Sequence, residues 1–252
     1  MSRFYVPPEA VKNGKIYAGK EESRHISSVM RLKEGDEVTV FDGSGEEYTG
    51  RIESVKNKGV IINIERTVTS PREPSVRVTL AQVLIKKDKM DYIVEKATEL
   101  GALEIIPLET GRAVVLPDKA AGGHKLERWQ RIAIEAAKQC GRRDLPKIKK
   151  INTFDEMLDI FPQYDMVLMP CLSEETIPLN KAITSAKDPK NILLLIGPEG
   201  DFTPDEIARS RQKGAILVSL GNLVLKSDTA AVAALAMLRY AYWGQTPTLP
   251  GV

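Results

Sequence analysis

The stretch Gly197-Pro198-Glu199-Gly200 joins an apolar segment to a segment that should begin a helix. A strand, a glycine-rich turn and a helix often bind a nucleotide phosphate, but this turn has neither of the two common phosphate-binding motifs. It also concentrates negative charge in four acidic residues, Glu199, Asp201, Asp205 and Glu206. Thr203 and Glu206 predict a capping box, so the helix N-terminus is already satisfied by its own anions and a phosphate would be repelled there. We therefore expect either a ligand without phosphate, which a cationic group would suit, or an ordinary strand-to-helix turn.

A second loop of unusual composition follows the apolar segment 215–220. Leu223, Val224 and Leu225 are consecutive apolar residues, although loops normally lie in water and carry polar side chains. These side chains must contact either packed protein or an apolar ligand such as an adenine ring. The loop ends where the last helix, 229–243, is expected to begin.

The composition is that of an ordinary globular protein, with 252 residues and a net charge of +2. The longest apolar run, 230–238, is too short to span a bilayer and no signal peptide is apparent, so we expect a cytoplasmic protein. Two cysteines and two histidines are too scattered for a zinc site or a disulfide framework. Residues 73–150 carry a net charge of +5 and residues 151–252 a net charge of −4. This asymmetry suggests a polyanion on one side and another ligand on the other, or else solvated helix faces.

The hydrophobic pattern changes near residue 72. Residues 1–72 contain short strands and one helix at 21–32, which is typical of a small β-barrel. After a linker at 69–74, apolar strands alternate with helices, and this predicts a parallel α/β sheet buried on both faces. Ligands of such sheets bind beyond the carboxyl ends of the strands. The expected strands of this sheet are 76–85, 103–108, 165–171, 191–196 and 215–220.

Several motifs together resemble the uracil-N3 methyltransferases of small-subunit ribosomal RNA, the ribosomal RNA small-subunit methyltransferase E family of the SPOUT superfamily. The resemblance extends over nearly the whole chain, and the ordered set of motifs is more specific than any one of them. The matching stretches are Arg3-Phe4, Met30-Arg31-Leu32-Lys33, Lys96-Ala97-Thr98-Glu99-Leu100-Gly101, Ile196-Gly197-Pro198-Glu199-Gly200, Leu220-Gly221 and Thr229-Ala230.

The resemblance implies an RNA-binding, PUA-like β-barrel at 1–72 and a SPOUT methyltransferase domain at 73–252, whose C-terminal part is tied in a trefoil knot. It also implies a homodimer, S-adenosylmethionine bound in the knot, and a uridine of 16S ribosomal RNA as the methyl acceptor. A sulfonium cofactor without phosphate agrees with the acidic turn. By motif, the cofactor would be held by Met169, Pro170, Cys171, Leu172, Leu195, Ile196, Gly197, Pro198, Glu199, Gly200, Leu220, Gly221, Leu223 and Leu225.

The chain departs from the family pattern where the methyl acceptor would bind. The family usually has two arginines where this chain has Leu223 and Lys226, and a glutamate where it has Asp228. Uracil N3 carries a proton that must leave as the methyl group arrives. We expect Asp228 to accept or orient that proton, and Lys226 to stabilise the negative charge that develops on the base carbonyl. Alternatively, Asp228 is the N-cap of the last helix.

Basic residues in both parts of the chain are candidates for RNA contacts. On the helix expected at 125–140, Arg128 and Arg131 lie apart from the apolar stripe, at a spacing that suits phosphate contacts. Each candidate taken singly could equally be a solvated surface charge. The other candidates are Lys86, Arg112 and Arg142, and in the first domain Arg24, Arg31 and Lys33.

Three other functions stay open. The superfamily resemblance also allows ribose 2′-O methylation or methylation at another base position. The residues that replace the usual arginines are compatible with an RNA-binding protein whose catalytic loop has decayed. A generic nucleotide-binding α/β enzyme is the third, and the absence of a phosphate-binding motif argues against it.

Overall fold

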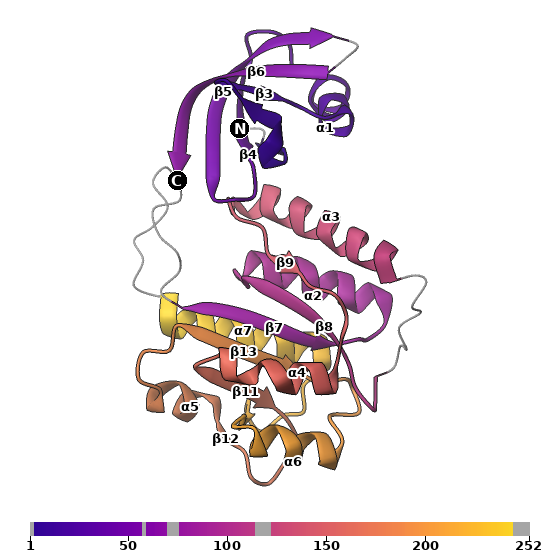
Figure 1. Ribbon diagram of the computed structural model, residues 1–252, viewed down its shortest axis with the longest axis vertical. Helices are drawn as coiled ribbons and strands as arrows, with labels where there is room; N and C mark the ends of the chain where they lie inside the picture. Colours follow the sequence, from indigo (N-terminus) through magenta and orange to yellow (C-terminus); the bar gives the residue numbers. More distant parts are fainter. Residues whose placement is uncertain (1–2, 57–58, 70–75, 114–121, 244–252) are drawn as a thin grey trace. The chain divides into compact units, whose positions relative to one another are not determined.

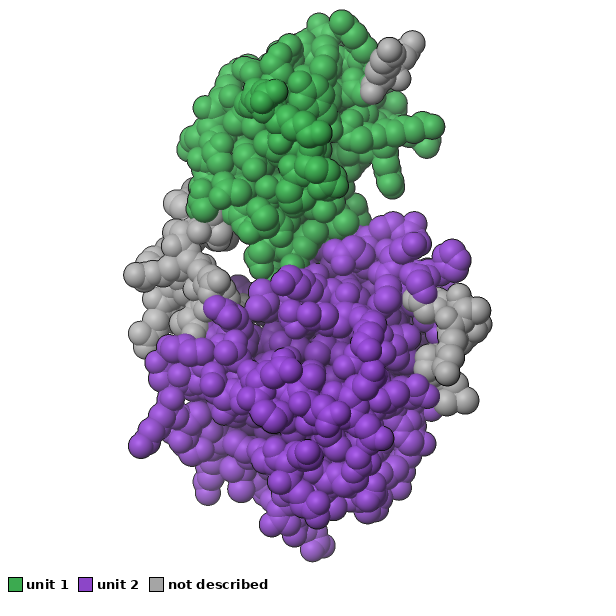
Figure 2. Space-filling model, viewed as in Figure 1, with its two compact units in different colours: residues 1–73, 134–145 green, residues 74–133, 146–252 purple. Residues whose placement is uncertain are grey.

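The computed structural model describes residues 3–56, 59–69, 76–113 and 122–243, which form two compact units (Figures 1 and 2). Unit 1 comprises Met1–Glu73 and Ile134–Leu145, and unit 2 comprises Pro74–Ala133 and Pro146–Val252. The first division lies one residue from the boundary expected at residue 72. In contrast, the segment 134–145, which the sequence analysis places in the second domain, packs within the first unit.

Unit 1 is built on a six-stranded sheet in the order β1-β4-β5-β6-β3-β2. The β1–β4 pair is parallel and the other pairs are antiparallel. Alternation along β5 and β6 places the paired residues Ile52 and Ile62 in the core. The elements of this sheet and its first connection are β1 (Arg3–Tyr5), the 3-10 helix η1 (Pro8–Ala10), β2 (Val11–Lys12), β3 (Lys15–Tyr17), β4 (Glu37–Phe41), β5 (Glu46–Lys56) and β6 (Gly59–Thr69).

One helical segment packs on the core of unit 1. Helix α1 (Lys20–Arg24) continues directly into the π-helical turn η2 (His25–Val29). This segment is shorter than the helix expected at 21–32, because Arg31 adopts a left-handed conformation with a φ of 56°. Ile26 is fully buried in the core, whereas Val29 is 63% exposed. The wider π turn thus ends the helix and turns its last apolar side chain to the surface.

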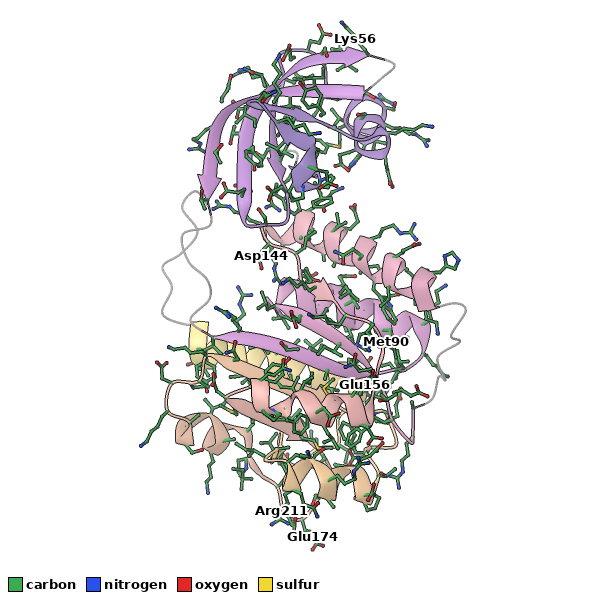
Figure 3. All side chains as sticks on the ribbon, viewed as in Figure 1. Lys56, Met90, Asp144, Glu156, Glu174 and Arg211 are labelled. Carbon is green, nitrogen blue, oxygen red and sulfur yellow. The ribbon has the colours of Figure 1, made fainter. Side chains whose placement is uncertain are left out.

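Arg3 ties the segment 134–145 to the sheet of unit 1. Its guanidinium lies 3.0 Å from Glu47 Oε2 and 4.1 Å from the centre of the Phe41 ring. It also donates hydrogen bonds to two carbonyl oxygens of the segment, Ala137 O at 2.6 Å and Arg142 O at 2.8 Å. A planar, always-charged group with five donors suits this combination of contacts. Asp144, labelled in Figure 3, extends the junction by bridging to the Gly43-Ser44 turn.

Unit 2 is built on a parallel sheet in the order β10-β8-β7-β13-β11-β14-β12, with β9 beside β8. The five strands expected from apolar runs are all present, with ends within two residues of the expected ones. Their near-continuous burial is typical of parallel strands covered on both faces. The strands are β7 (Arg77–Val83), β8 (Glu104–Glu109), β9 (Lys147–Ile148), β10 (Asn152–Thr153), β11 (Met166–Pro170), β12 (Ile177–Pro178), β13 (Asn191–Ile196) and β14 (Ile216–Ser219).

Helices cover both faces of this sheet (Figure 1). One face packs against α2, α5, α7 and the part of α3 that belongs to unit 2, and the other packs against α4 and α6. Met90 of α2, labelled in Figure 3, is 1% exposed within the first of these two cores. The helices are α2 (Lys87–Glu99), α3 (Gly122–Cys140), α4 (Phe154–Ile160) with the 3-10 turn η3 (Phe161–Gln163), α5 (Leu179–Ser185), α6 (Pro204–Gln212) and α7 (Ser227–Trp243).

The strand order places three loops at one edge of the sheet. Strand β13 lies between β7 and β11, and β14 lies between β11 and β12, so each later strand is inserted beside earlier ones. Because all of these strands are parallel, the carboxyl ends of β11, β13 and β14 meet at the same edge. The two loops of unusual composition, after β13 and after β14, are therefore neighbours.

Neither a membrane-spanning helix nor a metal-binding cluster occurs in the described ranges. None of their helices combines the length and apolar character that a membrane crossing requires. Nor do they bring together three or more histidine, cysteine, aspartate or glutamate side chains in a way that could bind a metal ion.

Candidate functional site

A pocket opens at this edge of the sheet, entirely within unit 2. Three loops line it, with residues 170–172 after β11, residues from 196 to 201 around the turn after β13, and residues from 218 to 225 after β14. Ser227 and Ala230, at the start of α7, complete the lining. The space measures about 630 Å³, including open solvent at its mouth. This size is in the range of small-molecule sites.

The walls of the pocket are apolar, although they are open to solvent. Leu172 is 66% exposed, and Leu223 and Val224 are each 75% exposed. Large apolar side chains gathered at an open site usually contact a ligand or a partner. Gly221 has a φ of 133°, a conformation that favours glycine, and this lets the backbone itself form part of the wall. The lining therefore fits an adenine ring and the apolar part of a thioether chain.

Eleven of the fourteen residues expected to hold the cofactor line this one pocket. They are Pro170, Cys171, Leu172, Ile196, Gly197, Pro198, Glu199, Leu220, Gly221, Leu223 and Leu225.

The other three expected cofactor residues do not line the pocket. Met169 and Leu195 are 0% exposed and belong to the core that faces α4 and α6. Successive side chains of a strand point to opposite faces, so the neighbours Pro170 and Ile196 reach the pocket while these two cannot. Gly200 is exposed, and its carbonyl oxygen accepts a hydrogen bond from Arg112 Nη1 at 2.8 Å.

The acidic turn is largely neutralised by its own partners. Glu206 accepts hydrogen bonds from the backbone N–H of Gly111 and Thr203, each at 2.8 Å, and forms the expected capping box with Thr203. Asp205 points away to Arg209, 3.7 Å distant. Neither residue lines the pocket, so only two of the four carboxylates of this turn face it.

Glu199 and Asp201 are the two carboxylates that do line the pocket, and both are already bonded. Glu199 Oε1 accepts a hydrogen bond from Lys89 Nζ at 2.6 Å, and this bond is the main cause that lowers the pKa of the Glu199 carboxyl. Asp201 accepts from the backbone N–H of Leu172 at 2.7 Å and of Phe202 at 2.8 Å. Because Leu172 and Asp201 come from different loops, this carboxylate fixes two walls of the pocket to each other.

Asp201 performs this role in a strained backbone conformation. Its φ is 60°, in the left-handed region that aspartate tolerates better than most residues. Burial, followed by the charge of Asp201, raises the pKa of the neighbouring Cys171 thiol to about 12. This thiol is therefore protonated at neutral pH and can contribute only packing to the pocket.

Asp228 and Lys226 lie beside the pocket, at the start of α7, without being part of its lining. The helix begins at Ser227, and Ala230 N donates to Lys226 O. Asp228 therefore sits in the first helical turn, and the alternative that it is the N-cap is wrong. Among the described residues, its Oδ1 is buried without a hydrogen-bond partner, and Lys89 Nζ is 3.8 Å away. Lys226 is exposed.

A buried network behind the pocket was not foreseen from the sequence. Gln82, at the carboxyl end of β7, is 0% exposed and donates to Ser227 Oγ at 3.0 Å. Ser227 Oγ in turn donates to Gly197 O at 2.6 Å. The network joins the turn after β13 to the first residue of α7. The signal that could have revealed this network is a glutamine within an otherwise apolar run of the sequence, because a buried amide needs hydrogen-bond partners.

The side chains of the candidate RNA contacts differ in their exposure and in whether they already have an ion-pair partner. In unit 1, Arg24, Arg31 and Lys33 are exposed, whereas the Arg142 side chain is 10% exposed and lies 2.6 Å from Asp144 Oδ2. Arg142 thus packs within its unit, where Asp144 is a partner, and its contact with RNA stays a prediction.

In unit 2, Lys86 and Arg131 are exposed. Arg128 makes a bidentate ion pair with Asp91 of α2, which raises its pKa. Arg112 donates to the carbonyl oxygens of Gly200 and Phe202 and so supports the turn after β13. Both members of the expected ridge on α3, Arg128 and Arg131, are therefore exposed, and Arg128 already has Asp91 as its partner.

Models of known protein families match both parts of the chain. A family model described as an RNA methyltransferase domain matches residues 71–239, and a model described as an RNA methyltransferase PUA domain matches residues 18–65. The chain is 31% identical over 235 residues to ribosomal RNA small subunit methyltransferase E of Bacillus subtilis, covering 92% of this chain and 90% of that protein. It is 32% identical over 237 residues to the protein of the same name from Synechocystis, covering 94% and 76%.

Two solved structures resemble the fold over almost its full length. Ribosomal RNA small subunit methyltransferase E from Neisseria gonorrhoeae, bound to S-adenosylmethionine, matches with a TM-score of 0.85 and 28% identity, covering 96% of this chain and 98% of that one. A protein from Legionella pneumophila in complex with the cofactor S-adenosylmethionine matches with a TM-score of 0.86 and 31% identity, covering 95% and 97%.

Proposed function

Because the chain belongs to the ribosomal RNA small subunit methyltransferase E family, we propose that it methylates 16S ribosomal RNA with S-adenosylmethionine as the donor, at N3 of a uridine. The observation that carries the proposal is the pocket itself. Eleven residues that family motifs assign to the cofactor come from three separate loops and converge on one apolar, open site.

The cofactor would be held by backbone and apolar groups of the three loops. Leu172, Leu223 and Val224 would cover the adenine ring, and the loop of Gly197 and Pro198 would pass along the nucleoside. When bound, S-adenosylmethionine supplies a methyl carbon whose bond to sulfur breaks with the electron pair kept by sulfur. The protein contributes alignment of that carbon with the acceptor nitrogen, which can account for much of the rate.

Asp228 is the proposed proton acceptor. Uracil N3 lies on the Watson–Crick edge, so the base must be unpaired or extruded from a helix before it can react. The buried Asp228 Oδ1 lacks a hydrogen-bond donor within the described part of the chain, and an N3–H group would supply one. The proton passes to Asp228 while the electron pair of the N–H bond stays on N3. Lys226, exposed beside it, would stabilise the negative charge that spreads to a base carbonyl.

The direct experiment is methylation of small ribosomal subunits that lack the modification. Incubation with the protein and S-adenosylmethionine, followed by mass mapping of the labelled nucleoside, should identify 3-methyluridine at a single position. A 2′-O-methyl nucleoside or a different methylated base would keep the cofactor assignment and overturn the acceptor. Absence of any transfer, with cofactor bound, would favour the decayed RNA-binding protein.

The exposed side of α7 supports the rest of the proposal, a homodimer. Met237 is 42% exposed and Tyr240 85% exposed, although a helix with apolar residues on nearly all sides is normally buried. A second copy of the chain would cover such a face. We therefore expect twice the chain mass in light scattering, and a mass of one chain at micromolar concentration would contradict the dimer.

A trefoil knot around the pocket, closure of the unit 1 sheet into a barrel, and a cytoplasmic location belong to the same proposal.

The exposed cations of unit 1 are the proposed RNA contacts of the PUA-like unit. Replacing Arg24 and Lys33 together with alanine should weaken RNA binding and reduce the slope of log affinity against log salt by about 2, one for each lost phosphate contact. Arg51→Ala is the matched control, because Arg51 is exposed in the same unit but pairs with Glu37 and Glu65. An unchanged salt slope in the double variant would remove these residues from the RNA interface.

A further inference from the structure

Lys89, in the first turn of α2, contacts two carboxylates from other parts of unit 2. Its Nζ lies 2.6 Å from Glu199 Oε1 and 3.8 Å from Asp228 Oδ1. Glu199 lines the pocket, and Asp228 lies in the first turn of the helix that follows the pocket loop. One ammonium group therefore spans the proposed cofactor turn and the proposed proton acceptor, which are 29 residues apart in the chain.

The position of Lys89 is unfavourable for α2 itself. The N-terminus of a helix carries partial positive charge, so a cation in the first turn is destabilising there. Lys86 and Lys87 add further positive charge to the same end, which Asp88 offsets only in part. A side chain whose charge opposes the local helix dipole in this way is typical of functional positions. The carboxylates of Glu199 and Asp228 are the partners that make the position favourable.

Lys89 remains a cation in this setting. The hydrogen bond with Glu199 is the largest cause that raises its pKa, and the charges of Asp228 and Asp88 act in the same direction. On the other side of the pair, Lys86 also helps to lower the pKa of Glu199. An ammonium group held protonated cannot remove a proton from a substrate. It can hold two negatively charged side chains in place.

We propose that Lys89 is a positioning residue for methyl transfer, which fixes Asp228 relative to the Glu199 wall of the cofactor pocket. The inference rests on the proposed function and adds a residue to it. Lys89 is hydrogen-bonded to Glu199 but stays beyond hydrogen-bond distance of Asp228 Oδ1. It thus restrains the Asp228 carboxylate without occupying the oxygen that would take the N3 proton.

The test compares Lys89→Met with Lys89→Arg. Methionine keeps most of the length of the side chain and removes its charge. We expect Lys89→Met to lower kcat at least about 10-fold, because misplacement of a reacting group acts on the chemical step. The KM for RNA should stay within about twofold. Arginine keeps the charge and should restore most of kcat. Melting temperature, recorded for both variants, separates a loss of positioning from a loss of folding.

Cofactor affinity provides a readout that does not depend on turnover. S-adenosylmethionine carries a sulfonium charge that S-adenosylhomocysteine lacks. Removing the Lys89 cation leaves Glu199 unneutralised, so Lys89→Met should shift the ratio of the two affinities toward S-adenosylmethionine by about two- to fivefold. Lys87→Met, a change of the same charge at an exposed position two residues earlier, should leave both affinities unchanged.

Three results would overturn the inference. The first is an unaltered kcat in Lys89→Met. The second is a parallel loss of kcat, of both affinities and of melting temperature in the methionine and arginine variants, because that pattern indicates packing alone. The third is failure of the unsubstituted protein to bind either S-adenosylmethionine or S-adenosylhomocysteine. This result contradicts the proposed function first, and the role of Lys89 with it.

Discussion

Replacing Asp228 with asparagine is expected to lower kcat for rRNA methylation by about 100- to 10,000-fold, the range found when a group that transfers a proton is removed. Asparagine has the shape of aspartate but cannot accept the N3 proton. Because Asp228 lies beside the pocket without lining it, the affinity for S-adenosylmethionine should stay within about twofold. Single-turnover kinetics and calorimetric titration measure the two quantities separately.

Asp205→Asn is the matched control for this variant. Asp205, like Asp228, is an acidic residue in the first turn of a helix, but it is exposed at α6 and lies outside the pocket lining. Both replacements should cost a similar, small stability, about 0.3–1 kcal/mol each, through the loss of a negative charge at a helix N-terminus. Full turnover in Asp228→Asn, with the same small stability loss as in Asp205→Asn, would reduce Asp228 to a residue that stabilises α7.

The largest effect on stability is expected from Gly50→Ala in unit 1. A Cβ at this position would lie 2.3 Å from the backbone oxygen of Asn63 and 3.0 Å from Ile62 Cγ2. Both atoms belong to β6, which pairs with β5 next to an irregularity between Thr49 and Gly50. The backbone oxygen cannot move without disturbing the ladder between the two strands, so we expect a loss of about 3 kcal/mol, at the upper end for overpacking.

Hydrogen exchange locates this destabilisation in the molecule. Protection should fall in the strands of unit 1, while the pocket in unit 2 should keep its affinity for S-adenosylmethionine. Gly19→Ala in the same unit is the control, because no atom lies within 4 Å of the added Cβ and the backbone is not in the left-handed region. A Gly50→Ala protein as stable as Gly19→Ala would mean that β5 and β6 are not packed as described.

The elements of unit 2 could be predicted because each follows from a local pattern. The apolar runs identified all the long strands, and Thr203 with Glu206 predicted the capping box that starts α6. Loop composition also pointed to the candidate site, since consecutive apolar residues in a loop, such as the exposed Leu223 and Val224 after β14, have few explanations other than a ligand or a partner. These signals depend on residues a few positions apart, where sequence spacing translates directly into geometry.

What the sequence could not predict depends on pairs that are distant in the chain. Lys89 and Glu199 are 110 residues apart, and only the strand order brings α2 beside the turn after β13. The acidic turn also has a distant partner for Glu206, the backbone N–H of Gly111, which no local pattern indicates. The low exposure of Arg142 has the same origin, since the segment 134–145 packs within unit 1.

Predictions that missed the pocket lining by one residue have a different cause. Met169 and Leu195 adjoin lining residues, but side chains alternate along a strand, so both point into the core on the opposite face of the sheet. Asp228 was a candidate cap because the helix was expected to begin at residue 229, whereas it begins at Ser227. Helix ends are the least certain part of such assignments, and here a shift of two residues separates a capping role from the proposed role as proton acceptor.

A crystal structure with S-adenosylhomocysteine bound is the most direct test of the proposed cofactor site. We expect the adenine ring against Leu172, Leu223 and Val224, with the sulfur atom directed toward the Asp228 end of the pocket. Well-diffracting crystals grown with a saturating concentration of this compound, in which the pocket is closed by its own leucines or the compound binds elsewhere, would contradict it.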